Sequence, residues 1–270
     1  MPASADQVSL VELTEPLRAD PARAAVLLDV DGTLAPIVRH ADDAHVPEPT
    51  RAPLIEVAKR YAVVACVSGR RAAVARRIVS LGSIAYVGNH GSELLRPGAR
   101  SAEIEPEVEA YGRRVQAFAQ SAWTEELHRL RVRAEDKDVI AAFHWRGAPD
   151  EAAAEAAVRE VAEAAEAAGF FTHWGRKVLE VRPPVPLDKG RGIQRLLQGT
   201  DLDAALYVGD DRTDLDAFRS LRDEVSAGRL RTAVCVGVRS EETPEEIQAG
   251  ADLLVDGPKG VRDLLRALLD

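Results

Sequence analysis

Cysteine, excess positive charge and long apolar runs are all scarce in this sequence. Only two cysteines occur in 270 residues, Cys66 and Cys235. Each lies inside a short aliphatic run, where a free thiol behaves as a small hydrophobic side chain. We therefore expect both to be buried, unreactive thiols.

Basic residues are outnumbered by acidic ones, 35 against 44, which gives a net charge of −9. A surface of this sign repels a nucleic-acid backbone or an anionic membrane, so neither is an expected partner. No stretch has the apolar length of a membrane span, and the first twenty residues lack a basic start followed by an apolar core. We expect a cytoplasmic protein, with a monomer favoured although the sequence leaves the oligomeric state open.

The composition itself is that of a globular protein, with 46% hydrophobic and 29% charged residues. At 270 residues the chain exceeds the size at which a single hydrophobic core usually stops growing. Two modest domains or one large domain are therefore expected.

Short aliphatic runs recur along the chain and alternate with helical patterns. The runs are 24–30, 62–67, 84–87, 204–208 and 233–238, and helices are expected over 50–60, 72–80, 190–197 and 215–221. Runs that are apolar on both faces are typical of parallel strands covered by helices on each side. The fold class predicted is α/β, a doubly wound and mostly parallel sheet.

The middle of the chain has a different pattern and predicts a smaller α+β domain. A helix over 105–129 and strands near 131–133 and 139–145 precede an Ala- and Glu-rich helix over 151–168, and two further strands follow at 170–174 and 177–181. We place this inserted domain at 103–187, so that the core domain comprises 1–102 and 188–270.

The first chemical motif follows the first buried strand, where the sequence reads LLDVDGT. Asp29 ends the strand and Asp31 lies on the same side of the extended chain. Two carboxylates at a buried strand end are costly without a cation, so a divalent metal is indicated. Gly32 and Thr33 allow a tight turn near a phosphate, although a plain turn after a strand is the simpler alternative.

Two further motifs stand where helices begin. The strand VVACV runs into Ser68, whose hydroxyl and neighbouring backbone N–H groups suit an anionic oxygen, or serve only as a helix cap. Lys189 begins another predicted helix, where its positive charge is unfavourable because of the helix dipole. We therefore expect an anionic group beside it.

The fourth motif is the densest group of acids in the chain. The strand ALYVG leads into Asp210, Asp211, Asp214 and Asp216. Acids this close together repel each other strongly unless a metal ion compensates their charge. Asp216 is better explained as part of a capped helix, and we leave it out of the site.

All four motifs lie at predicted strand ends or helix starts, where open α/β sheets bind ligands. In their order and chemistry, DVDGT, Ser68, Lys189 and GDDRTD resemble the four motifs of the haloacid dehalogenase superfamily of phosphatases. The α/β insertion between the second and third motifs is similar to the mobile cap of some of its members.

Within that superfamily the sequence resembles the trehalose-6-phosphate phosphatases over nearly its whole length. The resemblance lies in LDVDGTLAPIV with VPEPT, in VSGR with YVGNHGSEL, in EDKDVIAAFHWR, and in KVLEVRPP before DKG and VGDDRTDLDAF. One departure is Leu215, at a position where the family tends to have an acid.

The resemblance implies a Mg²⁺-dependent phosphatase acting on a small phosphorylated sugar, trehalose 6-phosphate. It makes Asp29 the nucleophile that forms an aspartyl-phosphate, and Asp31 the general acid and base. Ser68 and Lys189 would neutralise the phosphoryl oxygens. Mg²⁺ would be held or supported by Asp29, the main-chain carbonyl of Asp31, Asp210, Asp211 and Asp214.

The same resemblance assigns sugar recognition to polar residues of two regions. The cap would contribute Glu135, Lys137, Lys177 and Glu180, and the core Arg70, Asn89 and His90. Alternatives are another sugar phosphatase, acting on sucrose phosphate or mannosylglycerate phosphate, a phosphomutase, or a catalytically silent sugar-binding module. The intact core motifs argue against the last.

Overall fold

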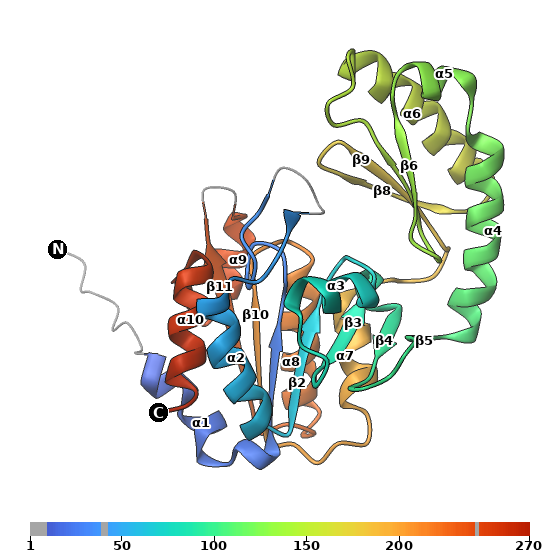
Figure 1. The fold of residues 1–270 in the computed structure, drawn as a ribbon. Helices are drawn as coiled ribbons and strands as arrows, with labels where there is room; N and C mark the ends of the chain where they lie inside the picture. The colour runs from blue at the N-terminus through green and yellow to red at the C-terminus, as the bar shows by residue number, and fades with distance from the viewer. Residues whose placement is uncertain (1–9, 39–42, 241–242) are drawn as a thin grey trace. The chain divides into compact units, whose positions relative to one another are not determined.

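The computed structural model describes residues 10–38, 43–240 and 243–270. The chain forms two compact units, each with its own β-sheet (Figure 1). The core unit combines the described residues up to Glu103 with those from Asp188 onward, and the inserted unit is Ile104–Leu187.

The sheet of the core unit has the order β12-β11-β10-β1-β2-β3-β4-β5. Its parallel strands are β1 (Ala24–Leu28), β2 (Val63–Val67), β3 (Ala85–Gly88), β10 (Ala204–Gly209), β11 (Thr232–Arg239) and β12 (Leu253–Asp256). β4 (Glu93–Leu95) runs antiparallel to β3, and β5 (Glu103–Ile104) forms the edge. The predicted mostly parallel sheet is confirmed.

Helices cover both faces of this sheet, because successive residues of a strand point to opposite faces. In β1, Val26 and Leu28 pack into one apolar layer, and Leu27 packs into the other. The first layer includes residues of α1 (Leu10–Ala19), α2 (Glu48–Arg60), α3 (Ala72–Val79) and α10 (Gly257–Ala267). The second includes α7 (Lys189–Leu197), α8 (Asp214–Ser226) and α9 (Glu245–Gly250). The doubly wound class is therefore confirmed.

The described residues of the core unit also form the short 3₁₀ helices η1 (Pro21–Arg23) and η3 (Asn89–Gly91). Cys66 and Cys235 are buried free thiols in β2 and β11, as predicted. Among the residues described, no helix combines the length and apolar character that crossing a membrane requires.

The inserted unit has an antiparallel sheet of order β6-β7-β9-β8. Its elements are α4 (Pro106–Ala122), α5 (Glu125–Arg129), β6 (Arg133–Asp136), β7 (Ala141–His144), α6 (Glu151–Ala167), β8 (Phe171–Gly175) and β9 (Val178–Arg182). Phe143 and Leu179 of the sheet pack in one cluster with Val115 of α4 and Val158 of α6. One face of this sheet is thus apolar and covered by helices.

Two local expectations for this unit are wrong. The single helix predicted over 105–129 is divided, because Thr124 caps a new helix by accepting the Leu127 N–H at 3.3 Å. The strand expected near 131–133 begins only at Arg133, since Arg131 has a positive φ of 56°. Both differences are local turn and cap features of the kind that periodicity does not report.

Candidate active site

The predicted site residues of the core unit gather at the carboxyl end of its sheet. Asp29 follows β1, Ser68 follows β2, and Asp210 follows β10. Lys189 and Asp214 are the first residues of α7 and α8. Because β1 lies between β2 and β10, these segments converge where the strand order changes direction, which is the usual ligand position in such sheets.

A buried lysine joins two of the carboxylates. The Lys189 Nζ lies 2.6 Å from Asp29 Oδ1 and 2.6 Å from Asp214 Oδ1. The exposed fractions of Asp29, Lys189 and Asp214 are 5%, 3% and 0%. The predicted anionic neighbour of Lys189 is therefore confirmed, and it is a pair of aspartates rather than a single one.

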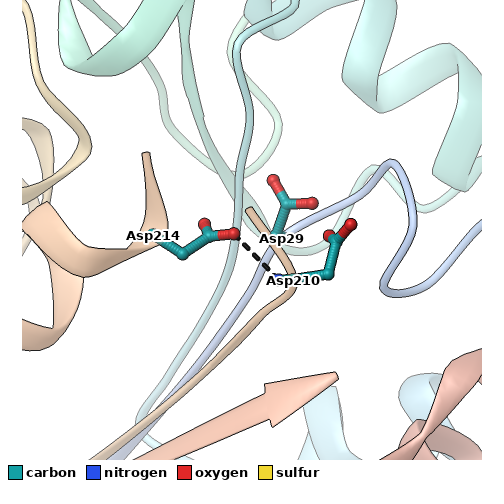
Figure 2. Close-up of side chains that lie close together, drawn as sticks. All are labelled: Asp29, Asp210 and Asp214. Atoms are coloured by element: carbon teal, nitrogen blue, oxygen red, sulfur yellow. Dashed lines mark hydrogen bonds between the residues drawn. The ribbon is translucent and has the colours of Figure 1, made fainter. Parts of the chain in front are cut away.

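Asp214 accepts hydrogen bonds on both of its oxygens. Oδ1 receives the Lys189 ammonium and the Tyr207 hydroxyl, which lies 2.6 Å away. Oδ2 receives the backbone N–H groups of Asp210 and Asp211, each at 2.9 Å, and Figure 2 draws the first of these bonds. Asp214 thus fixes the backbone that carries Asp210. Tyr207, the one hydroxyl-bearing residue of an otherwise apolar strand, was not among the site residues predicted from the sequence.

The turn after β1 holds Asp210 from the other side. Thr33 donates its hydroxyl to Asp210 Oδ1 at 3.0 Å. Gly32 has φ of 84°, and a Cβ built on it would lie 2.1 Å from Asp210 Oδ2. The glycine is therefore required by both its backbone conformation and the close approach of the carboxylate.

Burial and crowding make the charges of these carboxylates costly. The pKa of Asp29 is raised well above its usual value by burial and by the negative charges of Asp214 and Asp210, although Lys189 opposes the shift. Burial, together with Asp214, raises the pKa of Asp210 to about 7. Burial alone would lower the pKa of Lys189, but Asp214 and Asp29 raise it, so that its ammonium stays charged.

Three acids could offer oxygens to one metal ion. One carboxylate oxygen each of Asp29, Asp210 and Asp214 lies within 4.8 Å of the others (Figure 2). Buried oxygen donors of this kind suit a hard divalent cation such as Mg²⁺. Because four donors already occupy the oxygens of Asp214, its geometry fits a supporting role, and Asp29 and Asp210 are the better placed side-chain ligands.

Two other predicted metal residues lie outside this group. Asp211 is exposed, and its Oδ1 accepts the N–H of Arg212 at 2.6 Å. The side chain of Asp31 forms two hydrogen bonds of 2.7 Å with Arg70, from Nε to Oδ2 and from Nη2 to Oδ1. Neither carboxylate joins the three-acid group, which leaves the Asp31 main-chain carbonyl as the atom expected near the metal.

The loop after β3 is held by an acid that sequence analysis missed. Glu93 is 3% exposed and accepts the Asn89 Nδ2–H at 2.7 Å and the Ala72 N–H at 2.7 Å. Asn89 is fully buried, so its observed contact is with the loop rather than with an open surface. His90 is partly exposed, has a positive φ of 54°, and places its ring against Gly69.

The sheet face of the inserted unit that points away from its helices carries three of the four residues of this unit predicted to bind sugar. Glu135, Ala142 and Glu180 lie in register on β6, β7 and β9. Lys137 donates to Glu180 at 2.8 Å, and His144 lies 2.8 Å from Glu135. The hydrogen bond to His144 lowers the pKa of Glu135.

Lys177 is placed differently from those three residues. It stands in the turn between β8 and β9, with φ of 59°, and its Nζ lies 2.5 Å from Glu151 of α6. On β8, His173 lies in register with Glu180. A cavity of about 460 Å³ opens beside it, with Phe171, His173 and Arg182 in its lining. Sequence analysis did not include His173 in the site.

Comparison with solved structures defines the class of protein first. A haloacid dehalogenase-like hydrolase from Bacteroides thetaiotaomicron shares the fold with a TM-score of 0.62 at 13% identity, over 90% of this chain and 98% of that one. The trehalose-6-phosphate phosphatase of Aspergillus fumigatus matches with a TM-score of 0.64 and 26% identity, over 97% of both chains. The fold is therefore that of a haloacid dehalogenase-like hydrolase.

Sequence comparison then narrows the class to one family. The profile described as trehalose-phosphatase matches residues 27–250. A probable trehalose-phosphate phosphatase of Oryza sativa subsp. japonica is 32% identical over 265 residues, covering 90% of this chain and 69% of that protein. The chain belongs to the trehalose-phosphatase family, a family of phosphoric monoester hydrolases.

Proposed function

We propose that this protein hydrolyses trehalose 6-phosphate to trehalose and phosphate in the cytoplasm through an aspartyl-phosphate on Asp29. The observation that carries the proposal is the buried Asp29 carboxylate, paired with Lys189 and close to Asp210 and Asp214. A carboxylate held in this way beside a cation is equipped to attack an anionic ester. Membership of the trehalose-phosphatase family supports the choice of substrate.

The proposed reaction has two displacements at phosphorus. Lys189 contacts Asp29 Oδ1, so we assign the attack to Oδ2, which bonds to phosphorus as the bond from phosphorus to the sugar oxygen breaks. Asp31 gives its proton to that departing oxygen. Water then attacks phosphorus, Asp31 takes a proton from the water, and the bond between Asp29 and phosphorus breaks to release phosphate.

The surrounding cation and hydroxyl would stabilise charge on the transferring group. Lys189 is buried, and a cation in a low-dielectric site acts strongly on nearby phosphoryl oxygens. Ser68 is 1% exposed and its Oγ accepts the Arg70 N–H at 3.1 Å, so the hydroxyl proton remains available for an oxygen of the ester. Both residues then bind the phosphoryl group while Asp29 and Asp31 react.

We assign Mg²⁺ to the carboxylates of Asp29 and Asp210, with Asp214 holding the Asp210 backbone and Asp211 outside the site. When bound, the ion would neutralise negative charge at the carboxylates and the phosphoryl group. The donor set supports this assignment: Lys189 pairs with Asp29 and Asp214, whereas the ion pairs among the described residues give Asp210 no cationic partner.

Added Mg²⁺ should raise the melting temperature of the protein. At a concentration about 100 times the dissociation constant, binding to the folded state contributes about 3 kcal/mol, a shift of several degrees. Asp210→Asn should lose most of this shift, whereas Asp211→Asn, which removes an exposed acid beside it, should keep it. Differential scanning calorimetry with and without the ion measures the effect, and an equal shift in both variants would contradict the assignment.

We assign the inserted unit to sugar recognition, as a cap domain. The face of its sheet that points away from the helices carries Glu135, Lys137 and Glu180, and sugar hydroxyls need both donors and acceptors of this kind. Glu180 is 6% exposed and is held by Lys137 and Arg182, so its oxygens are fixed in position.

Lys137→Met should therefore affect a sugar ester more than a simple aryl ester. We expect KM for trehalose 6-phosphate to rise about 10-fold or more, because the sugar loses a donor and Glu180 loses a partner, while p-nitrophenyl phosphate is little affected. Lys177→Met is the matched variant, and its pairing with Glu151 predicts a smaller change. Steady-state kinetics with both esters test this, and equal losses on the two esters would count against a sugar-binding role.

A panel of sugar phosphates assayed with Mg²⁺ tests the proposed function directly. Trehalose 6-phosphate should be the preferred ester, with sucrose phosphate, mannosylglycerate phosphate and glucose 6-phosphate cleaved more slowly. Faster cleavage of another ester would overturn the substrate and leave the mechanism standing. Transfer of phosphate to a sugar on addition of glucose 1,6-bisphosphate would indicate a phosphomutase, and no phosphate from any ester would overturn the enzymatic proposal.

A further inference from the structure

Arg70 binds Asp31 through two nitrogens on one edge of its guanidinium group. Nε donates to Oδ2 and Nη2 donates to Oδ1, each at 2.7 Å. The two side chains are 22% and 36% exposed, so the pair is partly shielded from water. A two-point contact of this kind fixes the position and the plane of the carboxylate, which a single ammonium contact does not.

The backbone of Arg70 is anchored independently of this pair. Its N–H donates to Ser68 Oγ at 3.1 Å, and its carbonyl oxygen accepts the Asn89 N–H at 2.8 Å. The guanidinium therefore extends from a fixed turn after β2 to the loop after β1, joining residues 39 positions apart in the sequence. Arg70 is thus placed to set where Asp31 lies relative to Ser68, the predicted phosphoryl ligand.

The pair also limits what Asp31 can do. Both oxygens of Asp31 are engaged, so either one must give up a hydrogen bond before it contacts the departing sugar oxygen or the attacking water. A phosphate ester is an anion that competes for a guanidinium group. Arrival of the ester can therefore draw one N–H of Arg70 away and release one Asp31 oxygen, while the other N–H keeps the carboxyl group in place. The released oxygen takes up a proton from solvent water and gives that proton to the departing sugar oxygen.

We propose that Arg70 is a positioning residue for proton transfer by Asp31, which it holds by two hydrogen bonds at rest and by one when the ester is bound. The inference rests on the proposed function, in which Asp31 protonates the departing oxygen. It gives Arg70 a role distinct from a plain phosphate or sugar ligand, because its effect then depends on how much the leaving group needs a proton.

The test compares esters whose leaving groups differ in basicity. A sugar alkoxide needs a proton to depart, whereas a nitrophenolate does not. We would measure kcat/KM, which reports the first displacement, for a series from trehalose 6-phosphate through phenyl to p-nitrophenyl phosphate, using wild type, Arg70→Met and Arg70→Lys. Arg77→Met, which removes an exposed arginine of α3, is the control.

We expect Arg70→Met to lower kcat/KM for the sugar ester about 100-fold or more, and for the nitrophenyl ester by less than about 10-fold. Arg70→Lys keeps the positive charge but loses the two-point contact, so it should keep KM and lose kcat on the sugar ester. The melting temperature shows whether Arg70→Met folds. If it does not, Arg70→Lys is used to compare the loss of kcat/KM on the sugar ester with the loss on the nitrophenyl ester.

Equal losses across the series would overturn the inference, because a phosphate ligand or a purely structural residue affects every ester alike. Full rescue of the sugar ester by Arg70→Lys would overturn it as well, since charge alone would then suffice. Failure of the proposed function is distinguishable from both results. In that case the wild-type protein itself would release no phosphate from any member of the series.

Discussion

Replacing Asp29 by asparagine is expected to abolish phosphate release while leaving the protein folded. The amide has nearly the same shape as the carboxylate but is a poor nucleophile, so the first displacement fails. We expect turnover of trehalose 6-phosphate at least about 1,000-fold below wild type, measured as released phosphate. Trapping of acid-stable phosphate on the protein after rapid quenching should likewise be lost.

The fold of this variant should be at least as stable as wild type in the absence of metal. Burial and two neighbouring carboxylates raise the pKa of Asp29, which means that its charge is disfavoured in the folded state. Removing that charge relieves the repulsion from Asp210 and Asp214, and the amide oxygen can still accept a hydrogen bond from Lys189. Asp223→Asn, an exposed acid of α8, is the matched control and should keep full activity. Comparable turnover by Asp29→Asn would exclude Asp29 as the nucleophile.

Asp214→Asn, unlike Asp29→Asn, is expected to lose much of the stability of the folded protein. Each oxygen of Asp214 accepts two donors, so an amide nitrogen at either position faces two N–H groups or an ammonium and a hydroxyl. Lys189 loses one carboxylate partner in this variant, as it does in Asp29→Asn, so the difference between the two variants comes from the three other donors to Asp214. We expect the free energy of unfolding to fall by about 3 kcal/mol or more, because the substitution leaves buried hydrogen-bond donors without an acceptor.

Urea unfolding of Asp214→Asn beside Asp29→Asn measures this difference, since both changes remove one buried carboxylate charge. Phosphate release should fall as well, because the backbone at Asp210 and Asp211 is no longer held. A variant as stable as Asp29→Asn, with normal turnover, would show that the four donors contribute little. Tyr207→Phe, which removes one donor only, should lie between wild type and Asp214→Asn in stability.

The sequence predicted the strands of the core because they are buried on both faces. An apolar run such as 204–208 has few structural alternatives when helices flank it, and β10 begins at Ala204 as expected. The helix over 105–129 was wrong because a single capping residue, Thr124, outweighs an otherwise continuous helical pattern. Caps are local signals that are easily hidden by the periodicity around them.

The composition of the site was predictable, but its pairings were not. The acids that follow β1 and β10 indicated a buried charged cluster, and Lys189 was expected to have an anionic neighbour. Asp214 is buried and Asp211 is exposed. This difference arises where α8 begins, because Asp214 is the first residue of the helix and Asp211 precedes it. The contact of Arg70 with Asp31 depends on the packing of the neighbouring strands β1 and β2, and the contact of Tyr207 with Asp214 depends on how α8 turns back onto the end of β10; a single sequence reports neither.

The position of β1 in the sheet has a consequence for the order in which the chain folds. Its partner β10 lies about 180 residues further along the chain, since Ala24 pairs with Ala204. During synthesis the central strand therefore lacks one neighbour until the whole inserted unit has left the ribosome. The inserted unit is continuous in sequence and can form before the core is complete. We expect ribosome-bound chains that end before β10 to be the most sensitive to proteases and the most dependent on chaperones.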